Sequence, residues 1–177
     1  MHIVVAVRTI TMIVLLAVGM AGIRAVGIMG EPNQRNYPRF SELSGEDTAQ
    51  LDKQRSIVAA VAKQKYGTPS LTKTKRDLAV LQRLIDDHVF DKTQTYELQC
   101  LGVTFGDVLA SEFPLRWVMV TDEYGTDPTL RYKKMGLQIN ALTMISKRLE
   151  RNESVDLRQL VEITGQQLAR FEKDSSK

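Results

Sequence analysis

Three carboxylates stand within six residues of one another in the segment Asp122–Pro128 (DEYGTDP). Oxygen ligands from Asp122, Glu123 and Asp127 could hold Ca²⁺ or Mg²⁺, or supply a general acid and base as in carbohydrate hydrolysis. The spacing lacks the alternating Asp or Asn and the terminal Glu of a calcium loop, and Asp, Gly and Pro are also typical turn residues. A plain turn capped by Asp127, a recognition surface, and a metal or catalytic site therefore remain as alternatives.

The rest of the chain offers few groups for catalysis. It contains one cysteine, Cys100, and two histidines, His2 and His88. A catalytic Ser or Cys needs a histidine base, and His88 closes a predicted helix, where the helix dipole favours it. The sequence has no Gly-x-Ser-x-Gly, phosphate-binding loop, dinucleotide or His-Glu-x-x-His motif, and no zinc ligand set. We therefore assign no catalytic residue, no metal ligand and no cofactor.

The charge balance argues against a nucleic-acid partner. Lys and Arg number 24 and Asp and Glu 21, which gives a net charge of +3. The first 27 residues hold Arg8, Arg24 and no acid, so the other 150 carry 22 basic and 21 acidic residues. A domain that binds nucleic acid needs a concentrated basic face. At 43% apolar and 25% charged residues, the composition is that of a globular protein.

The amino-terminal segment is apolar. Residues 9–23 carry no charge and lie between Arg8 and Arg24. Fifteen apolar residues suit a signal peptide, whereas residues 9–29 could form an uncleaved inner-membrane anchor, the only part in contact with a membrane. If translation begins at Met20 or Met29 instead, the protein is cytoplasmic. We assign residues 1–28 to a signal peptide or anchor and residues 29–43, with two prolines, to a linker.

Helical patterns fill most of the remaining chain. Ser44 and Asp47 form a capping box before a helix that ends at Gly67. A second box at residues 74–77 opens a helix that ends near His88. A third helix has an apolar face interrupted by Gly102, which predicts close approach of another element. That face consists of Leu98, Leu101, Gly102, Phe105, Val108 and Leu109, and Pro114 ends the helix.

The carboxyl-terminal part combines strands and helices. Residues 115–121 predict a strand and residues 129–133 a weaker one, joined as a hairpin with a long tip. Asn140 caps a predicted helix over 141–151, and a fifth helix follows Asp156. We expect a single helix-rich α+β domain over residues 44–173, with about five helices and one small antiparallel β-hairpin sheet. Residues 174–177 form a frayed tail.

The segment LGVTFGDVLASEFPLRWVMVTDEYGTDPTLRY resembles a bacterial family described as domain of unknown function 3806. The resemblance extends over most of residues 42–165. The matching positions are Leu101, Gly102, Gly106, Asp107, Trp117, Asp122, Glu123, Tyr124, Gly125, Asp127, Pro128, Ile145, Lys147 and Arg148. Thr126, Thr129 and Ala141 depart from the family pattern. The resemblance implies relatedness and no particular activity.

These observations favour a non-enzymatic binding protein whose partner is another protein. An immunity protein or an inhibitor is one concrete form of such a binding protein. The expected binding residues are Trp117, Asp122, Glu123, Tyr124, Asp127, Arg131, Lys147 and Arg148. The alternative is an enzyme or divalent-metal-binding protein that uses Asp122, Glu123 and Asp127. A third alternative is a structural envelope component tethered by residues 9–29.

Overall fold

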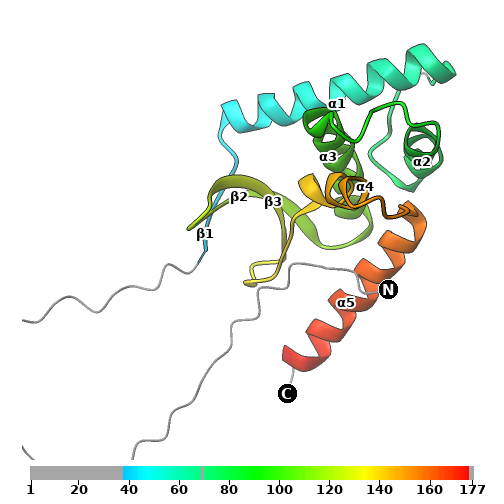
Figure 1. Ribbon diagram of the computed structural model, residues 1–177. Helices are drawn as coiled ribbons and strands as arrows, with labels where there is room; N and C mark the ends of the chain where they lie inside the picture. Colours follow the sequence, from blue (N-terminus) through cyan, green and yellow to red (C-terminus); the bar gives the residue numbers. More distant parts are fainter. Residues whose placement is uncertain (1–37, 69, 176–177) are drawn as a thin grey trace, which may run out of the picture.

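The computed structural model describes residues 38–68 and 70–175 (Figure 1). Within these residues, five α-helices pack beside one four-stranded antiparallel sheet, which confirms the predicted helix-rich α+β class. The α-helices are α1 (Gly45–Tyr66), α2 (Leu78–Asp86), α3 (Thr95–Glu112), α4 (Ser146–Glu150) and α5 (Leu157–Ser175). Two 3₁₀-helices, η1 (Lys75–Asp77) and η2 (Ala141–Thr143), precede α2 and α4. The predicted leader, residues 1–28, lies outside the described residues.

The predicted ends of α1 are confirmed. The Ser44 hydroxyl accepts a hydrogen bond from the Asp47 amide at 3.1 Å, and the Ser44 amide donates to the Asp47 carboxylate at 2.9 Å. At the other end, Gly67 adopts a left-handed conformation with φ of 69°, and its amide donates to the Lys63 carbonyl. Both ends therefore satisfy backbone groups that a bare helix would leave without partners.

Helix α3 forms the centre of the core. It packs against α1, α2, η2, α4 and β2 (Leu115–Asp122), and it lies below α1 in Figure 1. The predicted apolar face is buried, with Leu101 at 1% exposure and Phe105 at 0%. Because neighbours surround α3, the side chains off that face are buried as well. Cys100 is one of them, and burial raises the pKa of its thiol to about 11.

The predicted close approach at Gly102 is also present. A Cβ atom added there would lie 2.3 Å from the Leu142 carbonyl oxygen and 2.6 Å from that of Ala141. The helix predicted over residues 141–151 is consequently divided. Its first turn is the tighter η2, whose backbone lies against α3, and α4 begins only at Ser146.

The sheet has the order β1-β2-β3-β4. Its other strands are β1 (Arg39–Ser41), β3 (Gly125–Tyr132) and β4 (Gln138–Ile139). The strands of the β2–β3 hairpin are longer than predicted. The prediction of a long tip is wrong, because Asp122 pairs with Gly125 and only two residues remain between the strands. Pro128 lies within β3. It is tolerated because β4 pairs only with Leu130 and Arg131, so this part of β3 is a sheet edge.

Two short strands extend the predicted sheet. β1 lies inside the segment predicted as a linker, and it pairs with residues 119–121 of β2. β4 comprises two residues and pairs with the end of β3. Within residues 38–68 and 70–175, no helix is long and apolar enough to cross a membrane.

Candidate functional site

The hairpin tip, residues 122–127, is stabilised by the side chain of one of its own residues, Asp122. The Asp122 carboxylate accepts a hydrogen bond from the Tyr124 amide at 2.8 Å, which fixes the turn. Gly125 then takes a φ of 132°, a backbone conformation that other residues rarely adopt. Tyr124 is 74% exposed at the end of this turn. The tip therefore presents an aromatic side chain on a defined backbone.

The three carboxylates of the tip have different surroundings. Asp122 is engaged by the turn, whereas Glu123 and Asp127 are exposed. Asp127 lies within β3 opposite Val120, so the turn is capped by Asp122 and not by Asp127 as the sequence suggested. No three His, Cys, Asp or Glu side chains of the described residues are grouped so that they could hold a metal ion. Of the three carboxylates, only that of Asp122 is therefore part of the turn itself.

Arg131 belongs to the sheet and not to the tip. Its guanidinium donates to the carbonyls of Met135, at 2.8 Å, and Lys134, at 2.9 Å. The same group lies 4.3 Å above the centre of the Phe40 ring. Arg131 therefore fixes the connection from β3 to β4, and it also contacts β1 across the intervening strand β2.

Lys147 and Arg148 lie on α4, away from the tip (Figure 1). Lys147 is exposed. The guanidinium of Arg148 donates to the Met144 carbonyl, and burial lowers its pKa below the ordinary value. The eight residues expected from the sequence therefore do not form one site, and only those of the tip lie together.

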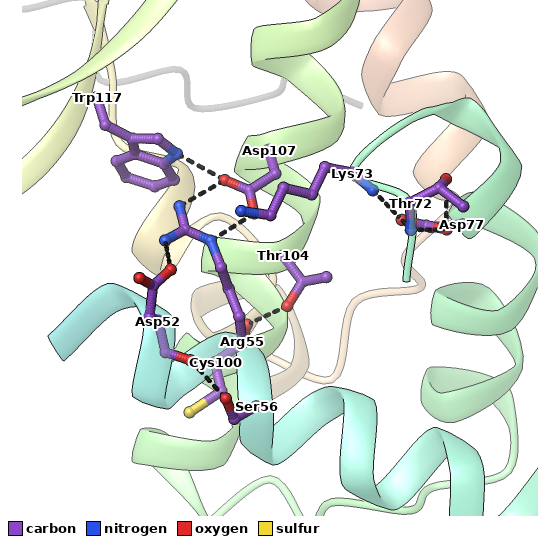
Figure 2. A network of polar contacts seen from close by, with 10 residues as sticks. All are labelled: Asp52, Arg55, Ser56, Thr72, Lys73, Asp77, Cys100, Thr104, Asp107 and Trp117. Carbon is purple, nitrogen blue, oxygen red and sulfur yellow. Dashed lines mark hydrogen bonds and ion pairs between the residues drawn. The ribbon is translucent and has the colours of Figure 1, made fainter. Parts of the chain in front are cut away.

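Trp117 belongs to a partly buried polar network that the sequence did not indicate (Figure 2). Its indole donates to Asp107 at 2.9 Å. Arg55 from α1 donates to both oxygens of the same carboxylate, from Nε at 2.6 Å and from Nη2 at 2.7 Å. The hydrogen bond to Asp107 raises the pKa of Arg55. Asp107 therefore joins α1, α3 and β2. The only feature of the sequence that could have indicated this network is an acidic residue within the otherwise apolar helix α3.

Truncation of Asp107 should destabilise the fold. Asp107 is 6% exposed, so Asp107→Ala leaves the Arg55 guanidinium and the Trp117 indole without their shared acceptor. We expect a loss of about 2 kcal/mol, moderated because Arg55 keeps its ion pair with Asp52. Asp52→Ala is the control, and it should cost less than about 1 kcal/mol because Asp52 is 60% exposed. Urea unfolding measures both, and equal losses would contradict the role given to Asp107.

Stability should also depend on the charge of Glu172, which ties α5 to the sheet. Its carboxylate accepts hydrogen bonds from Lys133 and Tyr132, and these hold its pKa below the ordinary value of 4.5. A carboxyl with a lowered folded-state pKa stabilises the fold above its unfolded pKa, and this contribution is lost as the pH falls through the folded value. We expect Glu172→Gln to reduce the free energy of unfolding near neutral pH.

The pH series separates this effect from a general loss of packing. The difference in unfolding free energy between Glu172→Gln and the natural protein should shrink below pH 4.5. It should vanish at pH values below the lowered folded-state pKa of Glu172. Denaturant unfolding at pH values from about 7 to about 2 measures it. A difference that stays constant over this range would show that the charge of Glu172 plays no part.

Comparisons with known proteins agree with this architecture. The family model with the description "Domain of unknown function (DUF3806)" matches residues 77–160. No curated protein gives a significant match. A crystal structure of a protein from Bacteroides thetaiotaomicron is similar in fold, with a TM-score of 0.65 and 16% sequence identity over 75% of this chain. The match covers 49% of that protein, so this chain spans about half its length. Residues 77–160 are therefore a domain that matches the family DUF3806, and they lie within the longer segment, most of residues 42–165, over which the sequence resembles that family.

Proposed function

We propose that this chain is a non-enzymatic protein-binding module, of the immunity or inhibitor type, whose hairpin tip contacts the partner. The observation that carries the proposal is the 74% exposure of Tyr124 on a turn fixed by Asp122. Tyrosine is enriched among the side chains that dominate binding energy at protein interfaces. An exposed tyrosine on a fixed turn loses little conformational freedom on binding, which favours affinity.

The charge of the tip suggests the character of the partner surface. Glu123 and Asp127 are exposed on either side of the turn, and Asp122 adds a third carboxylate within it. A negative surface of this kind is complementary to a basic patch and speeds association with it. We infer that the partner presents a pocket for an aromatic ring with a basic rim.

Partner capture with the full chain tests this proposal. The natural protein serves as bait in an extract of its source organism, beside the variants Tyr124→Ser and Glu123→Gln. The expected result is one protein that the natural chain retains, that Tyr124→Ser loses, and that Glu123→Gln retains less well at low salt. Melting temperatures of the three baits should agree, because both positions are exposed.

Tyr96 provides the matched control. It is the other exposed large hydrophobic side chain of the described residues, at 39%, and it lies on α3 and not on the hairpin. Tyr96→Ser should therefore retain the partner. Equal capture by Tyr124→Ser and the natural protein, or equal loss with Tyr96→Ser, would overturn the assignment of the tip.

We also propose that the chain is exported or anchored in the inner membrane through residues 9–29. The support is the uncharged apolar segment between Arg8 and Arg24. After fractionation of source cells, an antibody against the folded domain should detect the protein in the membrane or the exported fraction. Detection in the cytoplasm alone would contradict export and anchoring, and would support translation from Met20 or Met29.

A further inference from the structure

A groove of about 330 Å³ lies between α1, α3 and the segment 70–73. Its apolar wall consists of Ala59 and Ala60 from α1 and Leu71 from the segment. Two lysines also line it, Lys63 from the last turn of α1 and Lys73 from the segment. Its volume falls at the lower end of the range for small-molecule sites. The groove lies in a different part of the molecule from the hairpin tip.

The backbone at Lys73 is held in an unfavourable conformation. Lys73 has a φ of 59°, in the left-handed region that residues other than glycine rarely adopt. The carboxylate of Asp77, which is 4% exposed, compensates by accepting hydrogen bonds from the amides of Thr72, at 2.8 Å, and Lys73, at 2.7 Å. In Figure 2 the Lys73 side chain extends from this segment towards Asp107 and Arg55. The fold therefore fixes the point from which Lys73 reaches the groove.

The two lysines carry the uncompensated charge of the groove. Arg55 also lines it, but its guanidinium is engaged by Asp107 through Nε and Nη2 and by Asp52 through Nη1. No ion pair of the described residues includes Lys63 or Lys73, and both are exposed. Asp107 lines the groove too, and its single negative charge is matched by Arg55. The groove thus combines an apolar wall with two ammonium groups in excess over its acids.

We propose that this groove binds a small molecule that carries a phosphate monoester on an apolar body. Lys63 and Lys73 would donate to the phosphate oxygens, and Ala59, Ala60 and Leu71 would contact the body. An ammonium group is a point charge that suits phosphate, whereas a carboxylate is recognised best by a two-pronged guanidinium. The one arginine in the groove, Arg55, is already engaged by two acids.

Titration of the full chain with phenyl phosphate tests the proposal. We expect saturable binding in isothermal titration calorimetry, and amide shifts in α1 and the segment 70–73 in NMR spectra. Lys63→Gln and Lys73→Gln should each weaken binding about tenfold, the effect of losing one charge-assisted hydrogen bond. Benzoate, which has the same ring and a carboxylate, should bind more weakly than phenyl phosphate.

Lys65→Gln is the matched control, since Lys65 lies in the same turn of α1 as Lys63 but does not line the groove. The affinity of the Lys65→Gln variant for phenyl phosphate should equal that of the natural protein. Three results would overturn the proposal: no saturable binding at millimolar phenyl phosphate, equal weakening by Lys65→Gln, or benzoate binding as tightly. None of these three results involves the hairpin tip. Failure of the groove proposal would therefore leave the proposed protein binding by the tip untouched, and the two proposals can be tested separately.

Discussion

Replacement of Gly102 with leucine should prevent the domain from folding stably. Even the first added atom, Cβ, would lie 2.3 Å from the Leu142 carbonyl oxygen and 2.6 Å from that of Ala141. These are backbone atoms, so no change of rotamer relieves the overlap, and α3 must separate from η2. Overpacking usually costs about 1–3 kcal/mol, and we expect Gly102→Ala to reach the upper end of this range and Gly102→Leu to exceed it.

Urea unfolding, followed by the fluorescence of the single tryptophan, measures these losses. Gly45→Ala is the control, because Gly45 also lies in a helix and an added Cβ there has no atom within 4 Å. Its free energy of unfolding should be unchanged or slightly higher. If Gly102→Ala and Gly45→Ala had the same unfolding midpoint, the contact between α3 and η2 would not be as tight as described.

Phe105→Ala should remove about 3–5 kcal/mol of the free energy of unfolding. Phe105 is 0% exposed and is the largest of the fully buried side chains in the described core. It lies on α3, which packs against several elements at once, so the surrounding structure has little freedom to collapse into the cavity. The cost therefore combines the lost burial of the ring with an unfilled cavity.

Tyr96→Ala gives an aromatic truncation on the same helix at a site that is 39% exposed. It should change the free energy of unfolding by less than about 1 kcal/mol, because its ring is partly in water already. Thermal and urea unfolding of both variants provide the comparison. A Phe105→Ala variant as stable as Tyr96→Ala would place the ring outside the core.

Elements with strong local signals were predicted well from the sequence. The capping box of Ser44 and Asp47 and the buried stripe of α3 both depend on residues within one or a few turns. Gly102 indicated a close approach because a glycine on an apolar helix face has a cost that packing must offset. β1 and β4 have three and two residues, too few for a period of two to be recognised, and partners elsewhere in the chain define them.

The sites were less predictable because they depend on long-range pairing. Trp117 was singled out as a binding residue, but its indole is bonded to Asp107 inside the molecule. Arg55 and Asp107 are separated by 52 residues, and no periodicity relates a residue of α1 to one of α3. The tip was located correctly, since DEYGTDP is rich in turn residues, yet its two-residue turn depends on the register of β2 and β3.

Site-specific photo-crosslinking tests the central claim, that the hairpin tip contacts a partner protein. A photoreactive phenylalanine derivative is placed at position 124, and at position 96 in a control, in the full chain expressed in its source organism. We predict one discrete adduct from position 124, absent from position 96 and competed by excess natural protein. No adduct from position 124, or the same adducts from both positions, would contradict the claim.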